Sequence, residues 1–394
     1  MFAQIFGQDH VAELLQHELV NEELPQALLF SGERWSGRMT AALETARIIH
    51  CSQGGVPACR CSSCRSSRTL EHPYTMVFAN RSFLPLIEAA IAASRQGSAD
   101  TGELLKRSVH MLMRRFDSHW NLQEKDFRDQ LEELSEILRD AASREMRPGG
   151  IPEKSFETIR KLSRKLAEGI KSENMPIHAI RSLQGWLSTK PRNQSAVVIL
   201  EGVEQFSSAS KNGLLKFLEE PPANVTVILL SEGQGRIIPT ILSRVRKYPF
   251  VRRGDDAAAS VIRDVYYQDP EEFDSLETFF LTQSGVDCRS VREDAEFLVE
   301  TLYQPREYDH QRFCGMLSRL DKQNLVWRAL QELTDVLREY RESGQLDADL
   351  ESSAWQAVSA CSREITGKHQ RESVIFESCY YRLAEIWKYH RGNA

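Results

Sequence analysis

The sequence has no long apolar run. No stretch approaches the roughly 18 consecutive apolar residues that a membrane-spanning helix requires. The first sixteen residues, MFAQIFGQDHVAELLQ, include Gln, Asp and His where a signal peptide would have an apolar core. We therefore expect a cytoplasmic protein that does not enter a membrane.

The sequence also lacks an excess of positive charge. It has 50 Lys and Arg against 56 Asp and Glu, giving a formal net charge of -6. A protein whose whole surface bound nucleic acid would be strongly basic, so that class is excluded. A local basic patch within a larger assembly is still compatible with this balance.

Predicted strands and helices alternate along the first part of the chain. Short apolar runs at 26–30, 72–78, 196–200 and 225–230 predict buried strands, separated by segments with helical spacing. Such alternation predicts an α/β domain with a parallel sheet. From about residue 252 onward the sequence predicts helices only: a small helical unit over 252–286 and longer helices over 288–394.

A charged helical segment interrupts this α/β pattern between about residues 83 and 172. Apolar residues at helical spacing mark one stripe over 127–138 and another over 156–170, with Pro148-Gly149-Gly150 between them. Two such helices around a turn predict an inserted helical hairpin. Its role is either structural, as a packed hairpin with charged outer faces, or that of a partner-binding arm.

Four of the eight cysteines lie within fourteen residues, at Cys51, Cys59, Cys61 and Cys64. Structural zinc sites are tetrahedral and commonly take paired cysteines two to four residues apart. The cluster therefore predicts a closed, structural zinc site. Free thiols in a loop and a redox pair are the alternatives.

Two dense motifs identify a family. The run 214–223 reads LLKFLEEPPA, and after the next predicted strand the run 238–244 reads IPTILSR. These runs resemble the clamp-loader family of AAA+ proteins, specifically bacterial gamma/tau and delta prime subunits. The opening runs Phe6-Gly7-Gln8 and LPQALLFSG at 24–32 resemble the same family. The resemblance covers roughly 1–80 and 175–285, and it implies a P-loop NTPase-like domain, a helical lid and an all-α C-terminal domain.

The segment after the first predicted strand has the glycine spacing of a phosphate-binding loop, G-x-x-x-x-G-K-[ST]. Gly32 and Gly37 are both in place, but Arg38 stands at the lysine position and Met39 at the hydroxyl position. A methionine cannot ligate magnesium, which binds oxygen. Thr40 comes one residue late, about 100° further round a helix. We interpret the loop as vestigial.

The acidic site after the strand 196–200 is altered as well. The family pattern has Asp-Glu there, whereas this chain has Glu201-Gly202. Glu201 could still approach a metal, but Gly202 has no side chain to activate water. Both changes predict a subunit without ATP hydrolysis of its own, in which ATP binding is weak or absent. The resemblance assigns this degeneracy to delta prime subunits.

Ser243-Arg244-Val245 resembles the Ser-Arg-Cys motif of the family. The resemblance implies that Arg244, with Ser243 beside it, reaches a γ-phosphate bound by a neighbouring subunit, as an arginine finger does. The alternative is a surface or salt-bridged arginine in an arginine-rich stretch. The family also has four cysteines after its first helix, although with C-x2-C-x2-C spacing where this chain has C-x-C-x2-C.

Three functions follow from these patterns. The first is a delta prime-like, non-catalytic subunit of the DNA polymerase III holoenzyme, which would help gamma/tau-like and delta-like subunits load the sliding clamp on primed DNA. The second is an active gamma/tau-like ATPase, and the third is an interaction scaffold built on the inserted hairpin. The expected domains are an AAA+ domain over 1–250 with the zinc segment 51–64 and the insertion, a lid over 251–287 and an oligomerisation collar over 288–394.

Overall fold

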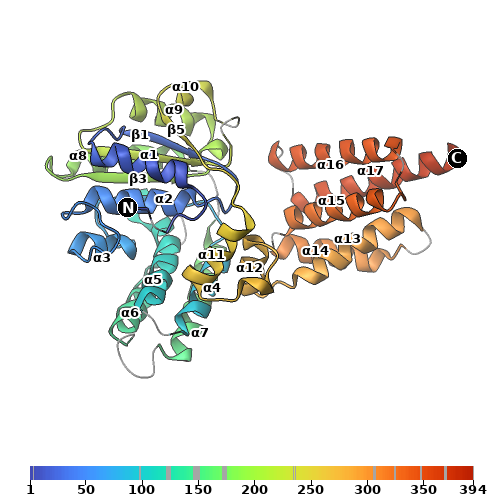
Figure 1. The fold of residues 1–394 in the computed structure, drawn as a ribbon, viewed down its shortest axis with the longest axis horizontal. Coiled ribbons are helices and arrows are strands. Elements are labelled where there is room, and N and C mark those ends of the chain that lie inside the picture. Colours follow the sequence, from blue (N-terminus) through green and yellow to red (C-terminus); the bar gives the residue numbers. More distant parts are fainter. Residues whose placement is uncertain are drawn as a thin grey trace. The chain divides into compact units, whose positions relative to one another are not determined.

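The structure is a computed structural model of the whole chain, and it forms two compact units, Met1–Ser284 and Gly285–Ala394 (Figure 1). It describes residues 1–393 with the exception of 3, 97–98, 121–125, 145–150, 171–174, 234, 236, 305–307, 324, 347 and 368–370. The predicted turn Pro148-Gly149-Gly150 lies outside the described residues.

A five-stranded, all-parallel sheet forms the centre of the first unit, with strand order β2-β3-β4-β1-β5. This confirms the predicted α/β AAA+ fold. The edge strand β5 was not predicted from the sequence. The strands are β1 (Ala27–Ser31), β2 (Thr75–Phe78), β3 (Ala196–Glu201), β4 (Val225–Ser231) and β5 (Arg246–Pro249).

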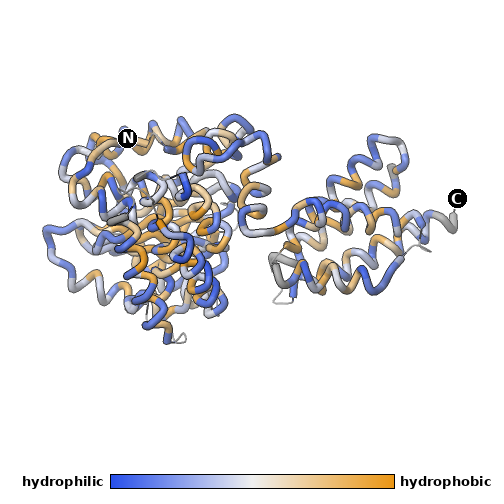
Figure 2. The backbone as a smooth tube through the Cα atoms, turned by 90° about the horizontal axis from the view of Figure 1, so that it is seen from below, coloured by the Kyte–Doolittle hydropathy of each residue, from blue (hydrophilic) through white to orange (hydrophobic). Residues whose placement is uncertain are grey.

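Each face of the sheet carries its own hydrophobic core, because neighbouring residues of a strand point to opposite faces. In β3, Val197 and Ile199 enter one core, whereas Val198 and Leu200 enter the other. Figure 2 shows the apolar segments gathered inside this unit. The first core includes α1 (Asp9–Val20) and α2 (Arg38–His50), and the second includes α8 (Ile177–Thr189), α9 (Ser208–Glu219) and α10 (Pro239–Leu242).

The predicted insertion over 83–172 contains four α-helices among its described residues, which is more than the expected hairpin. The apolar faces of all four join the first core, and Leu134, Ile159 and Leu166 are completely buried there. The segment is therefore packed onto the domain through its apolar side. The four helices are α4 (Leu84–Ser94), α5 (Ala99–Met113), α6 (Arg128–Arg144) and α7 (Glu153–Gly169).

Two further helices of the first unit, α11 (Asp255–Tyr266) and α12 (Leu276–Gln283), fall within the predicted lid. Tyr266, Phe279 and Phe280 form a cluster of mutually packed rings. These rings belong to the first core, so these helices and the sheet share buried surface. The short helix α3 (Ser62–Arg68) follows the cysteine segment.

The second unit is all-helical in its described residues, as expected from the sequence. Its interior combines apolar packing with a buried hydrogen bond between Thr301 Oγ1 and Tyr380 Oη at 2.8 Å. Among the helices that the structure describes, none is long and apolar enough to cross a membrane. The helices are α13 (Cys288–Tyr303), α14 (His310–Gln323), α15 (Val326–Glu342), α16 (Ala348–Gly367) and α17 (Glu372–Asn393).

Candidate functional site

The phosphate-type loop lies between β1 and α2, where the first strand ends and α2 begins at Arg38. Both glycines are required by the backbone. Gly37 has φ of +97°, in the left-handed region that favours glycine. A Cβ on Gly32 would lie 2.4 Å from the Phe250 carbonyl oxygen, which is too close for any other residue. The loop therefore has the backbone of a phosphate cradle at a helix N-terminus.

The side chains at the start of α2 do not offer the groups of a working loop. Met39 is 5% exposed and packs in the hydrophobic core. Arg38 is also buried, and its Nη2 donates to the Glu33 carbonyl at 3.3 Å. Burial lowers the pKa of Arg38, although Glu201 and Glu232 oppose this effect. The loop thus holds a buried guanidinium in place of an extended ammonium and a hydroxyl.

The carboxylate of Glu201 already accepts hydrogen bonds from residues of its own chain. Arg81 forms an ion pair with it through Nη2, and Arg81 Nε donates to Glu201 Oε2 at 2.9 Å. The backbone N–H of Asn80 donates to the same Oε2 at 2.9 Å. A carboxylate held by three donors has little capacity left for a magnesium ion. The sequence patterns did not indicate Arg81, although its position three residues after the end of β2 places it near the ends of the other parallel strands.

Residues of the predicted lid contact the phosphate-type loop through hydrogen bonds and ring stacking. Arg253 Nη1 donates to the Trp35 carbonyl at 2.6 Å, and its Nε donates to the Phe6 carbonyl at 3.1 Å. The Trp35 ring stacks on Phe280 of α12 with centroids 4.4 Å apart. Burial lowers the pKa of Arg253 to about 10. The side chains of Arg253 and Phe280 therefore lie beside the loop. Nothing in the sequence pattern indicated the contribution of Arg253.

Arg244 lies two residues after the end of α10. It is one-third exposed. Its Nη1 donates to the Thr240 carbonyl at 2.8 Å and lies 3.3 Å from Ser243 Oγ. Its Nη2 lies 2.6 Å from Glu219 Oε1, at the end of α9. The guanidinium is thus held at the surface by its own chain, and Ser243 is in contact with it.

The four clustered cysteines converge in space. The Sγ atoms of Cys51, Cys59, Cys61 and Cys64 all lie within 4.8 Å of one another, and those of Cys51 and Cys59 are 3.6 Å apart. Four sulfurs bound at about 2.3 Å to one tetrahedral ion would be about 3.8 Å apart, so the set fits zinc. The shortened spacing is accommodated because Cys61 caps α3, which brings Cys64 back towards it.

Arg47 supports this cluster from α2. Its side chain is 2% exposed; Nη1 lies 3.0 Å from Cys64 Sγ, and Nη2 donates to the Gly55 carbonyl at 2.9 Å. The backbone N–H of Cys64 holds the pKa of Cys61 at about 6, whereas burial raises the pKa of Cys64 to about 12. A bound zinc ion would deprotonate all four thiols and, with four protein ligands, would have a structural role.

Metal analysis of the purified chain is expected to find about one zinc ion per chain, because four thiolates complete one tetrahedral shell. Mass spectrometry under native conditions, before and after treatment with acid and chelator, measures this directly. A soluble, folded protein that carries no metal would contradict the zinc assignment.

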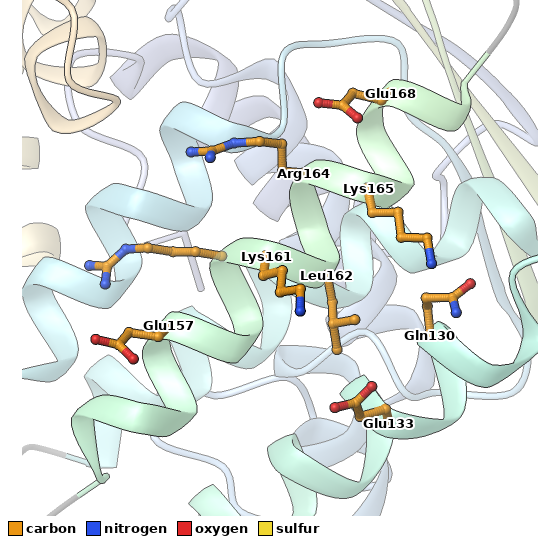
Figure 3. Close-up of a pocket in the computed structure, with 9 residues that line it drawn as sticks. Gln130, Glu133, Glu157, Lys161, Leu162, Arg164, Lys165 and Glu168 are labelled. Carbon is orange, nitrogen blue, oxygen red and sulfur yellow. The ribbon is translucent and has the colours of Figure 1, made fainter.

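A charged groove runs between α6 and α7, with a volume of about 570 Å³ (Figure 3). Lys161 and Lys165 of α7 face Glu133 and Gln130 of α6 across it. Among the described residues, no ion pair joins Glu133 to either lysine. The groove is a solvated, mixed-charge surface and contains no arrangement typical of a catalytic site.

Comparison with known proteins shows which family this chain belongs to. The model of the family described as DNA polymerase III, delta subunit, matches residues 7–114 and 142–253, which is more than half of the chain. The chain belongs to the DNA polymerase III clamp-loader AAA+ family. The unmatched segment inside this family domain is 115–141, much shorter than the predicted insertion over 83–172, so α4, α5 and α7 fall in the matched parts.

Curated relatives include both kinds of clamp-loader subunit. The gamma/tau subunit of Mycobacterium bovis is 25% identical over 251 residues, covering 63% of this chain and 28% of that protein. The delta' subunit of Bacillus subtilis is 22% identical over 245 residues, covering 62% of this chain and 47% of that protein. A tau/gamma subunit of Haemophilus influenzae is 36% identical over 104 residues, covering 26% of this chain and 14% of that protein. The chain thus spans less than half the length of these relatives.

Proposed function

We propose that this chain is a delta prime-like subunit of a DNA polymerase III clamp loader that does not hydrolyse ATP. In this proposal its partners are gamma/tau-like and delta-like AAA+ subunits, and the assembled complex places the sliding clamp on primed DNA. The proposed domains are the AAA+ domain over 1–250, a lid over 251–287 and an oligomerisation collar over 288–394.

The observation that carries this proposal is the state of the nucleotide pocket. Arg38 and Met39 replace the lysine and the hydroxyl residue, and Met39 is buried in the core. Glu201 is bound by Arg81, while Gly202 offers no base. An active gamma/tau-like ATPase would need groups that hold magnesium and activate water at these positions. Sequence identity is similar for both kinds of relative, so these residues, rather than identity, favour the delta prime-like function.

The isolated chain is expected to show no ATP turnover above the background of a buffer control. The Glu201→Gln variant should behave in the same way, because Glu201 already serves the ion pair with Arg81. Phosphate release with magnesium and ATP in excess measures the rate. Turnover that disappears in Glu201→Gln would identify this chain as an active ATPase and would reject the proposal.

The scaffold function receives no support from the hairpin. The apolar residues of α6 and α7 are buried in the core that they share with the sheet, which leaves their charged sides for solvent. We propose instead that the chain acts on its neighbours through Arg244, which would serve, with Ser243, as an arginine finger for the ATP of the adjacent subunit. Zinc at Cys51, Cys59, Cys61 and Cys64 would stabilise the fold.

A further inference from the structure

Glu219 contacts the guanidinium that the proposed function assigns to the neighbouring ATP site. Glu219 is the last residue of α9, within the run LLKFLEEPP, and its Oε1 lies 2.6 Å from Arg244 Nη2. The two residues are 25 positions apart, so only the packing of α9 and α10 brings them together. Both are exposed, Arg244 by 33% and Glu219 by 48% of their side-chain surface.

The contacts of Arg244 leave a usable part of its guanidinium open. Nη1 has two N–H groups, and its two contacts are the Thr240 carbonyl and Ser243 Oγ. Nη2 uses one N–H for Glu219. Among the described residues, Nε and the second N–H of Nη2 have no acceptor. A guanidinium can present such a pair of donors to two oxygens of a phosphate at once.

Three contacts from one chain also fix the orientation of the side chain. A free arginine has many rotamers, and ordering it at the moment of reaction costs entropy. Contacts that already restrict it reduce that cost, as in other preorganised sites. The ion pair is exposed, so its own contribution to stability is small. Its effect should therefore appear in the reaction rate rather than in the folding of the subunit.

We propose that Glu219 is a positioning residue for Arg244, holding the guanidinium so that Nε and Nη2 face the γ-phosphate bound by the neighbouring subunit. This inference rests on the proposed function of Arg244 in trans. It gives the first glutamate of the Glu-Glu-Pro-Pro run a role beyond ending a helix. The second, Glu220, is exposed and has no ion-pair partner among the described residues, so it provides a matched control.

The test is the ATPase activity of the reconstituted clamp loader containing Glu219→Ala, Glu219→Gln, Glu220→Ala or Arg244→Ala. We expect Glu219→Ala to lower kcat about tenfold with little change in KM, because a displaced guanidinium weakens the transition state more than ATP binding. Glu219→Gln keeps an acceptor oxygen and should recover part of the rate. Glu220→Ala should match the unmodified loader.

The double variant Glu219→Ala/Arg244→Ala separates positioning from a general structural effect. If Glu219 acts through Arg244, the double variant should be no slower than Arg244→Ala alone. A further loss in that background, an unchanged kcat in Glu219→Ala, or a faster loader would each overturn the inference. An unchanged rate in Arg244→Ala would instead reject the proposed function of Arg244 itself, so the two failures are distinguishable.

Discussion

An assembled clamp loader that carries Arg244→Ala in this subunit is expected to hydrolyse ATP more slowly while remaining intact. Arginine fingers contribute roughly 10³–10⁵ in rate at the site that they serve. Because the finger would serve only one ATP site, we expect the loss to be confined to that site. Single-turnover phosphate release resolves it, and size-exclusion chromatography checks that the complex stays together.

The control for this prediction is Arg246→Ala, two residues further along the chain. Arg246 is 55% exposed and pairs with Glu18 at 3.4 Å, on the edge strand rather than beside α9. It should leave the ATPase rate unchanged. If Arg244→Ala and Arg246→Ala gave the same rate as the unmodified loader, Arg244 would be an ordinary surface arginine with an intrachain ion pair.

The second large effect is expected from Cys64→Ser. Cys64 is fully buried and accepts a contact from the buried Arg47. The variant loses one of the four predicted zinc ligands together with that contact, while Arg47 keeps its ion pair with Glu44. Structural zinc contributes roughly 10–16 kcal/mol to the folding of small zinc-binding peptides. Losing only part of this would lower Tm by about 10 °C or more in a domain of this size.

Thermal unfolding followed by circular dichroism, together with zinc content, measures this outcome. Cys314→Ser is the matched control, because Cys314 is an exposed cysteine on α14 of the second unit. It should change neither Tm nor the amount of zinc. A Cys64→Ser protein with full zinc content and an unchanged Tm would show that the four thiols do not form a metal site.

The strands that the sequence predicted are those buried on both faces. β3 and β4 read as nearly continuous apolar runs because both of their faces are covered. β5 lies at the edge of the sheet, and Arg246, Lys247 and Pro249 are exposed while Tyr248 alone is buried. Edge strands often carry charged and proline residues. The pattern of β5 therefore resembles a loop, and only its pairing with β1 reveals the strand.

Helical periodicity also does not set the boundaries of the predicted insertion over 83–172, which stay a prediction. Amphipathic helices outside the sheet have the same periodicity whether they belong to the family domain or are added to it. The charged faces of α5 and α7 resembled those of an added element, although both lie in parts of the chain that the family model matches. Helical periodicity indicates which side of a helix is buried, but it does not indicate which other element of the fold covers that side.

The sequence by itself determined the parallel α/β domain, the altered phosphate loop at Gly32–Thr40, the four-cysteine cluster and the family motif that contains Arg244. These are local patterns, in which residue type and spacing carry the information. Only the tertiary structure decided that Arg81 binds Glu201, that Arg253 fastens the loop and that Glu219 holds Arg244. Each of these contacts joins groups 25 to 218 positions apart, and no local pattern encodes which distant partners the packing of strands and helices brings together.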